Sequence, residues 1–417
     1  MFMQTKSMNA IVERSHNDAT AVVKPSSTRY YRPELDVVRF LAFLLVFVYH
    51  TLPSSRDPRV VHFLGMFALE YDAFSNACGF GLSLFFTLSA FLICELLLRE
   101  RQASGTVAVE KFYIRRILRI WPLYYFGVML GVAATLLPGI PHSSLAKMGW
   151  FAIFMGAWVC ATQGGFTNPA IVLWSVSVEE QFYLIAPWMI KYTSRRTLSA
   201  FCVALVVFSC CWLFYFGRVK AFHYVIWFNS FVQFECFAVG ILLCLALNGR
   251  LPKFAAWQRI ALLLLAILGW FYACYGLHAI PTDYLAQNPG SWSLICGYGF
   301  GALGSVLVLV AVLGVRSSLL PAWAIYLGRI SFGLYVFHAF AIYLTNSLVL
   351  DKVTQYKGIT IVRSLEGPIY LFNMALTLGL TILMAALSYR YLETPFLKMK
   401  SRIAVIESEP VGTASIK

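Results

Sequence analysis

Charged residues are scarce in this chain. Of its 417 residues only 12% are Asp, Glu, Lys or Arg, whereas 59% are hydrophobic. A soluble domain carries about 25% charged residues because its surface must be solvated, so this composition excludes a soluble globular protein. The 16% of aromatic residues is typical of a lipid-facing shell with Trp and Tyr at the membrane interfaces. The sequence therefore predicts an integral membrane protein that has membrane lipids as partners.

Other absences narrow the function further. The net charge is +14, but no soluble domain gathers it; Lys and Arg recur in short clusters between apolar runs, so no nucleic-acid partner is expected. The ten Cys residues mostly lie inside apolar runs, which predicts buried thiols and no disulfides. Neither Cys nor His shows the spacing of a ligand cluster, so no metal is expected. No internal repeat is detectable, although many transporters are built from repeats.

Long apolar runs begin at Leu35 and recur through the chain. Each run has the roughly 18 to 25 residues that a helix needs to cross a membrane, which predicts an all-α, polytopic membrane helix bundle. The ten predicted transmembrane helices are residues 35–53, 75–98, 117–137, 171–191, 197–216, 230–247, 259–277, 293–315, 328–350 and 368–392. The membrane domain is expected to cover residues 30–397, between a mobile tail at 1–29, which lacks the apolar core of a signal peptide, and a C-terminal tail at 398–417.

The basic clusters predict the orientation of the bundle. Loops rich in Lys and Arg lie in the cytoplasm under the positive-inside rule, and ten spans with both termini in the cytoplasm satisfy nearly all of these loops. A weaker apolar run at residues 150–161 is too short to cross and is expected to be re-entrant or interfacial. The predicted location is the cell (inner) membrane, which the chain crosses several times.

An ionisable residue inside a membrane-spanning run costs free energy, so each such residue marks a possible functional site. The first span holds Asp36, Arg39 and His50. Arg39 and His50 are eleven residues apart, so on a helix they share one face about 16 Å apart along the axis. Two interpretations stay open. Either both residues line a polar channel, or Arg39 pairs with Asp36 one turn back while His50 sits at the outer interface.

A basic string precedes the third span and contains Arg115, Arg116 and Arg119. The positive-inside rule alone accounts for a basic loop at this place. It does not account for Arg116 and Arg119 sharing one helical face at the membrane surface. Two guanidiniums in that arrangement can bind phosphates in a bidentate manner, which Lys does less well.

The fourth span opens with Trp174 and Ser175 and carries the adjacent acids Glu179 and Glu180. Adjacent helical residues point about 100° apart, so at most one acid faces a given cavity. The other can stabilise the positive end of the helix. We expect Glu180 to be the acid that points inward.

The ninth span places Ser331, Tyr335 and His338 near one helical face by their spacing. A lone His on such a face is more often a hydrogen-bonded core residue than a catalyst, and both roles stay open for His338. Near the end of the last span, Glu393 is expected to pair with Arg390. Just after it, a proline at position 395 is expected to stop the helix.

Six strings together resemble acyltransferase family 3, whose members O-acylate cell-surface polysaccharides and some small molecules. In chain order they are LDVVRFLAFLLVFVYH, FFTLSAFLI, FYIRRILRIWPLYY, LWSVSVEEQFYLIAPW, ISFGLYVFH and SYRYLETP, and they cover residues 30–396. The residues that match the family's motifs are Arg39, His50, Arg116, Arg119, Trp174, Ser175 and Glu180. Two departures, Ala90 for a common Gly and Phe332 for a common Tyr, remove no reactive group.

The resemblance implies a stand-alone O-acyltransferase that uses an acyl-CoA, most simply acetyl-CoA, from the cytoplasm as co-substrate. The residues expected to bind this donor are Arg39, Arg115, Arg116 and Arg119. His50 is expected to act as general base on an acceptor hydroxyl of a glycan or glycolipid, with Glu180 orienting its imidazole. A variant of this scheme has His50 carry the acyl group covalently. Ser175 and Tyr335 are candidate oxyanion donors.

Two other classes stay open on the residues alone. A transporter or exporter of a small anionic or acylated metabolite would use intramembrane Arg, His and Glu to line a pathway or relay protons. The missing repeats and the paired arginines at the cytoplasmic surface argue against it. A membrane scaffold without catalytic activity is the third class, and it would give the donor-binding residues no purpose.

Overall fold

The computed structural model describes residues 30–53, 65–137, 140–142, 144–280, 289–350 and 366–403, which are helical and contain no β-strand. The expected all-α class is therefore confirmed for the described residues. The residues from Arg32 to Ile403 form one unit of the chain. The tail predicted at 1–29 and most of the tail predicted at 398–417 lie outside the described residues.

Seven helical segments of the described chain are long and apolar enough to cross a membrane, so the chain is a multi-pass membrane protein. They are α4 (Ala68–Cys78) with α5 (Gly81–Ser104), α6 (Val109–Ala134), α10 (Arg195–Arg218), α12 (Ser230–Leu247), α13 (Ala256–Tyr275), α14 (Ser291–Val312) and the segment Pro368–Lys400, which contains most of α18 (Glu366–Ser388). An eighth arises if α15 (Ala322–Arg329) and α16 (Ser331–Thr345), bent by 75° at their junction, form one broken span.

Two further helices coincide with predicted spans but are more polar. They are α2 (Pro33–Thr51) and α9 (Trp174–Tyr192), and each carries three charged residues within its 19 residues. Their length matches the first and fourth predicted spans. The count of ten transmembrane helices stays a prediction.

The weak apolar run at 150–161 is broken into two short helices, α7 (Ser144–Ala152) and α8 (Gly156–Gln163). Phe154 between them has a positive φ of 58°, and its ring stacks on Tyr124 of α6 with centroids 4.4 Å apart. Helices of eight or nine residues are about 12 to 14 Å long, less than half of the hydrocarbon thickness. This agrees with the prediction that the run does not cross by itself.

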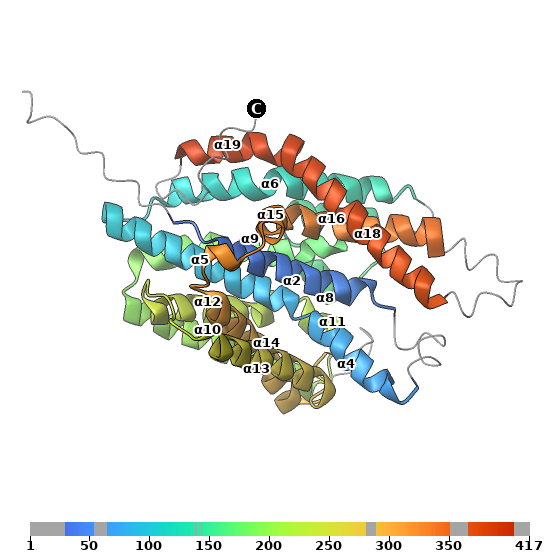
Figure 1. The fold of residues 1–417 in the computed structure, drawn as a ribbon, viewed down its shortest axis with the longest axis horizontal. Coiled ribbons are helices and arrows are strands. Elements are labelled where there is room, and N and C mark those ends of the chain that lie inside the picture. The colour runs from blue at the N-terminus through green and yellow to red at the C-terminus, as the bar shows by residue number, and fades with distance from the viewer. Residues whose placement is uncertain are drawn as a thin grey trace, which may run out of the picture. The chain divides into compact units, whose positions relative to one another are not determined.

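Helices α2 and α5 lie side by side in the interior of the bundle (Figure 1). One flank is formed by α6, α16 and α18, and the other by α10, α12, α13 and α14 (Figure 1). Most side chains of α5 are buried. The helices approach closely where residues are small: a Cβ on Gly240 of α12 would lie 2.4 Å from the carbonyl oxygen of Thr87 on α5, and small residues permit such contacts in membrane bundles.

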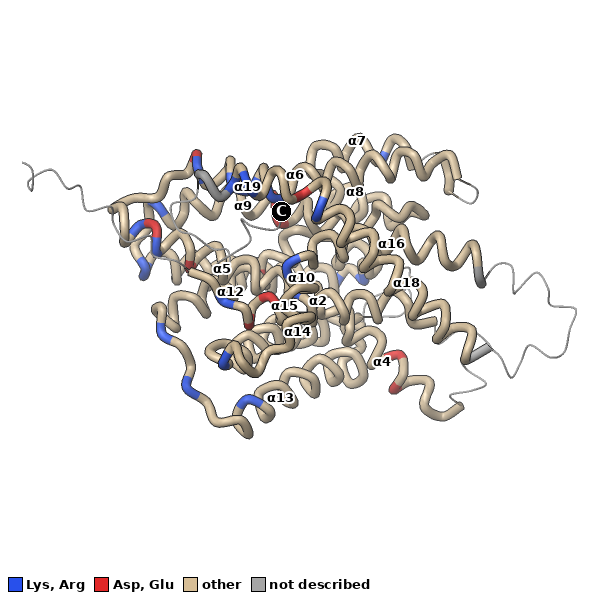
Figure 2. The backbone as a smooth tube through the Cα atoms, turned by 45° about the horizontal axis from the view of Figure 1, so that its top comes forward, with Lys and Arg blue, Asp and Glu red and all other residues tan. Residues whose placement is uncertain are grey.

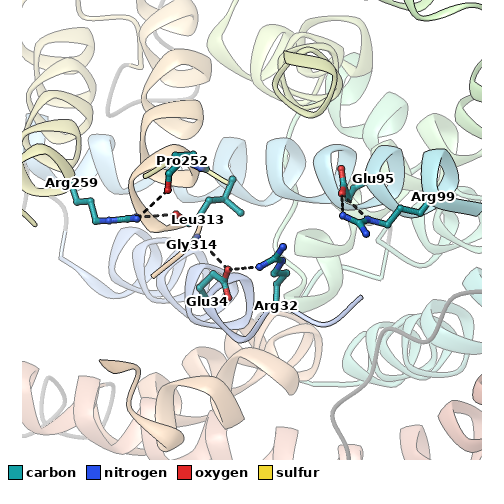
Figure 3. A network of polar contacts seen from close by, with 8 residues as sticks. All are labelled: Arg32, Glu34, Glu95, Arg99, Pro252, Arg259, Leu313 and Gly314. Atoms are coloured by element: carbon teal, nitrogen blue, oxygen red, sulfur yellow. Dashed lines mark hydrogen bonds and ion pairs between the residues drawn. The ribbon is translucent and has the colours of Figure 1, made fainter. Parts of the chain in front are cut away.

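Hydrogen bonds hold the basic ends of several helices together. Arg101 Nη1 at the end of α5 donates to the carbonyls of Ile190 and Thr193 at the end of α9, at 2.5 and 3.0 Å. Arg259 of α13 donates to the carbonyl of Leu313, just after α14, at 2.9 Å (Figure 3).

The next residue, Gly314, joins this end of the bundle to the start of α2. Its N–H donates to Glu34 Oε1 at 3.4 Å (Figure 3). Figure 2 shows many Lys and Arg residues near helix ends, while long helical stretches carry no charge. The positive-inside rule predicts such a grouping of basic helix ends. We call the side of the bundle that holds Arg101, Arg259 and the start of α2 its basic end.

Candidate functional site

One continuous helix, α2, carries both Arg39 and His50. Pro33 occupies its first turn, where the missing N–H costs no hydrogen bond. Arg39 Nη1 donates to Asp36 Oδ1 at 2.6 Å, and Asp36 is buried. The local pairing considered for these two residues is therefore present. His50 is exposed near the other end of the same helix.

Three arginines from two helices gather around one carboxylate. Arg39 of α2 and Arg116 and Arg119 of α6 all interact electrostatically with Glu179 of α9. We call Arg39, Arg116 and Arg119 the arginine cluster. Asp36 is paired to Arg39, while Glu180 also interacts electrostatically with Arg116 and Glu393 with Arg119.

The guanidiniums of Arg116 and Arg119 are not held by an acid. Neither makes a hydrogen bond or a salt bridge with another described residue. The guanidinium carbon of Arg116 lies 5.5 Å from the ring centre of Phe112 and 5.2 Å from that of Tyr183. Cation–π contacts hold an Arg in place and leave its N–H donors open. Within the arginine cluster, Arg116 therefore offers open, oriented donors to an anion, and Arg119 adds a second guanidinium that no described acid binds.

The acid that faces the arginine cluster is Glu179. Its Oε2 accepts a hydrogen bond of 3.0 Å from the Tyr183 hydroxyl, which also contacts Ser89 Oγ at 2.6 Å. Glu180 points elsewhere: its Oε2 accepts from Trp121 Nε1 at 3.2 Å, and no hydrogen bond joins it to His50 among the described residues. The expected support of His50 by Glu180 is thus not seen, because neighbouring side chains on α9 diverge by about 100°.

Arg115 has a different partner from its neighbours. Its Nη2 lies 2.9 Å from Glu100 Oε2, and Glu100 is buried. The other carboxylate oxygen of Glu100 accepts from the backbone N–H of Ala108 at 2.9 Å. This pair joins the end of α5 to the start of α6, so Arg115 has a structural partner where Arg116 and Arg119 have none.

At the other end of α2, His50 meets His338 of α16 with ring centres 5.1 Å apart. We call these residues the histidine pair. His50 Nδ1 lies 2.9 Å from the carbonyl oxygen of Val46, and His338 Nδ1 lies 2.6 Å from that of Tyr335. A carbonyl oxygen only accepts hydrogen bonds, so each Nδ1 carries the hydrogen. In a neutral imidazole the other nitrogen, Nε2, then keeps a free lone pair. Both histidines are therefore held as the tautomer whose Nε2 can accept a proton.

The remaining predicted residues lie on α9 and α16. The hydroxyls of Ser175 and Tyr335 are 2.7 Å apart, and both reach the carbonyl of Val172, at 3.2 and 3.0 Å. Their hydrogens are thus shared within the protein, which leaves neither hydroxyl as a free oxyanion donor. Trp174 packs edge-on against Phe228, and Ser331 is buried at the bend before α16.

The end of α18 departs from two expectations. A π-helical turn, Tyr389–Glu393, carries Glu393, whose Oε1 accepts from Ser388 Oγ at 3.3 Å. No ion pair with Arg390 forms among the described residues; Arg390 lies over the ring of Tyr391. The π turn changes the helical phase, so the spacing of an α-helix no longer applies. The proline at 395 does not stop the helix, because it lies in the first turn of α19 (Thr394–Ile403), where Pro is tolerated.

Helices α2 and α9 join the two groups of residues. Helix α2 carries Arg39 of the arginine cluster and His50 of the histidine pair. Along α9, Glu179 faces the arginines, and Ser175, one turn earlier, contacts Tyr335 of the turn that precedes His338. The site therefore has a cationic part at the basic end of the bundle and a proton-accepting part further along the same helices.

Comparison with known proteins gives two kinds of match. An acyltransferase-domain family, acyltransferase family 3, matches residues 32–390. The protein named "Putative O-acetyltransferase SAS0844" of Staphylococcus aureus strain MSSA476 is 21% identical over 388 residues, which are 88% of this chain and 58% of that protein. The O-acetyltransferase OatA of Staphylococcus aureus strain NCTC 8325 is 25% identical over 372 residues, 83% of this chain and 57% of that protein. The chain thus spans less than three fifths of the length of these relatives. No solved structure matches.

Proposed function

Because the chain belongs to acyltransferase family 3, we propose that it is a membrane O-acetyltransferase. Its donor is acetyl-coenzyme A, and its acceptor is a hydroxyl group of a glycan on the other side of the membrane. The relatives named as O-acetyltransferases support the reaction type. The observation that carries the proposal is that a single helix, α2, has unpaired arginines beside one end and a proton-accepting histidine at the other.

The arginine cluster supplies the donor site. The phosphates of coenzyme A carry several negative charges, and the open donors of Arg116 and Arg119 suit bidentate contacts with them. The unpaired positive charges of Arg116 and Arg119 attract such an anion. This part of the site lies on the side where basic helix ends gather, which the positive-inside rule assigns to the cytoplasm. The donor then approaches from the cytoplasm, and the protein resides in the cell (inner) membrane.

His50 is the general base of the transfer. The distance along α2 from Arg39 is about 16 Å, which the pantetheine arm bridges while it brings the thioester to His50. The acceptor O–H bond breaks and its proton passes to His50 Nε2. The acceptor oxygen forms the ester bond with the acyl carbon, the C–S bond breaks, and its electron pair leaves on sulfur. His50 then returns the proton to the sulfur.

The test is acetyl transfer by protein purified in detergent. Cellotetraose, maltotetraose and chitotetraose serve as hydroxyl acceptors. Free coenzyme A is quantified by chromatography, since the ten Cys residues would react with thiol reagents. We expect at least one oligosaccharide to accelerate coenzyme A release. His50→Gln should lower that rate by about 10²- to 10⁴-fold, the usual contribution of a general base, with unchanged coenzyme A binding.

The matched control is His142→Gln, because His142 is exposed and lies outside the site. It should keep the wild-type rate. If His50→Gln releases coenzyme A as fast as the wild type, His50 is not the base. If no oligosaccharide accelerates release, the glycan acceptor is wrong.

A further inference from the structure

His338 has a polar atom that the fold leaves without a partner. Its side chain is fully buried, and Nδ1 is used by the carbonyl of Tyr335 at 2.6 Å. The other nitrogen, Nε2, is buried and has no hydrogen-bond partner among the described residues. The titratable group that interacts with this imidazole electrostatically is His50. An unpaired acceptor in a membrane bundle destabilises the fold, since no water is at hand to satisfy it.

Packing alone does not account for this arrangement. The ring of His338 is 6.2 Å from Phe43 and 5.5 Å from Tyr335, centre to centre. These contacts use the apolar surface of the ring, which Phe would supply without an unsatisfied nitrogen. Buried polar groups in proteins nearly always have partners, so the unpaired nitrogen of His338 calls for an explanation.

We propose that His338 is the positioning residue for His50 and that its Nε2 accepts a hydrogen bond from protonated His50 during acyl transfer. The inference rests on the proposed function, in which His50 takes the acceptor proton. Once the acceptor oxygen has become an ester oxygen, it is a poor partner for the new N–H of His50. His338 Nε2, on the adjacent ring, receives that N–H until the proton passes on to the departing sulfur of coenzyme A.

A second imidazole suits this role better than a carboxylate at this depth. A carboxylate would be a buried ion in the resting enzyme, which is costly without a permanent cationic partner. A neutral imidazole adds no charge before the reaction, yet it can share the proton as soon as one arrives.

The test compares kcat and KM for acetyl-CoA, with the oligosaccharide that the wild type acetylates fastest. In His338→Gln, the amide oxygen reaches the place of Nε2 and still accepts a hydrogen bond. His338→Phe keeps the ring volume without an acceptor. We expect kcat to fall about 100-fold in His338→Phe with unchanged KM, and to recover about tenfold in His338→Gln.

Two controls separate positioning from packing. Phe43→Leu alters the ring beside His338 without touching a polar group and should stay within about threefold of the wild-type kcat. Coenzyme A binding at the arginine cluster reports whether each variant is folded. If His338→Phe does not fold, His338→Asn replaces it, because its shorter amide reaches the place of Nδ1 but not that of Nε2.

Wild-type kcat in His338→Phe, or in His338→Asn where that variant replaces it, refutes the inference. So does a His338→Gln that is as slow as the variant without an acceptor, or a Phe43→Leu that is equally slow. These results leave His50→Gln inactive and the proposed function intact. A wild-type protein that acetylates no oligosaccharide refutes the proposed function itself, and the inference falls with it.

Discussion

We predict that the same substitution affects ligand binding at Arg119 and protein stability at Arg115. Both lie one turn apart in the first half of α6, before the apolar part of that helix. Arg119 makes no hydrogen bond or salt bridge with a described residue, whereas Arg115 is paired with the buried Glu100. Arg119→Gln should therefore weaken coenzyme A binding with little loss of stability. Arg115→Gln should lower stability and leave binding almost unchanged.

The magnitudes follow from the contacts. A hydrogen bond between a guanidinium and a phosphate contributes about 1.5 to 3 kcal/mol, so losing one in Arg119→Gln raises the Kd of coenzyme A about 10- to 150-fold. Removing Arg115 leaves Glu100 as a buried charge with one remaining partner, the N–H of Ala108. Breaking a buried pair in this way costs about 3 to 5 kcal/mol. Because Arg115 is 15% exposed, solvent screening reduces this, and we expect about 2 to 3 kcal/mol.

The assay pairs two measurements on each variant in detergent. Isothermal titration calorimetry gives the Kd of coenzyme A, and thermal unfolding gives the change in stability. Repeating the titration at several salt concentrations adds a check, because the Kd of an anion held by partly exposed guanidiniums rises with ionic strength. Equal losses of binding in Arg115→Gln and Arg119→Gln would refute the assignment of the donor site to the unpaired arginines.

Two further predictions concern the surroundings of the arginine cluster. Glu179→Gln keeps the acceptor for the Tyr183 hydroxyl but removes a negative charge, so calorimetry at low salt should show about fivefold tighter coenzyme A binding; weaker binding would mean that the carboxylate holds the arginines in place. Gly328→Ala should destabilise the protein by about 1 to 3 kcal/mol in thermal unfolding, because its Cβ would lie 1.9 Å from the backbone oxygen of Asp36. Gly299→Ala, with open space around the new Cβ, is the control and should unfold no earlier than the wild type.

Local periodicity predicted well what depends on one regular α-helix, and it failed at the end of α18, where a π-helical turn changes the spacing of Arg390 and Glu393. The apolar runs placed the helices because a run of about 20 residues is long enough to cross a membrane as one helix. The shared face of Arg39 and His50 followed from their spacing, since α2 is continuous between them. The pairing of Arg39 with Asp36 was foreseen as one of two alternatives for the same reason.

Contacts between helices could not be predicted from the spacing of residues within one helix. The partner of Arg115 is Glu100 on the preceding helix, and the partner of His50 is His338 on a helix far along the chain. These depend on how helices rotate against one another, which the spacing of residues does not determine. The choice between Glu179 and Glu180 depends on the same rotation.

A signal for Glu179 was nevertheless present in the sequence. Ser175, Glu179 and Tyr183 follow one another at intervals of four, so they share a face of α9. At the same intervals of four, Glu180 has the apolar residues Val176 and Leu184. Reading polar residues as a stripe, instead of judging the two acids one by one, would have selected Glu179.

The polarity of α2 and α9 is itself evidence about the site. Both helices match predicted spans in length, yet each carries three charged residues, and these include Arg39 and Glu179. A charge inside a membrane bundle is retained only where it meets a partner or serves a function. Here Arg39 of α2, with Asp36, meets Glu179 of α9 at the arginine cluster, while the apolar remainder of α2 leads to His50. The charged residues of these two helices are therefore among those on which the proposed chemistry depends.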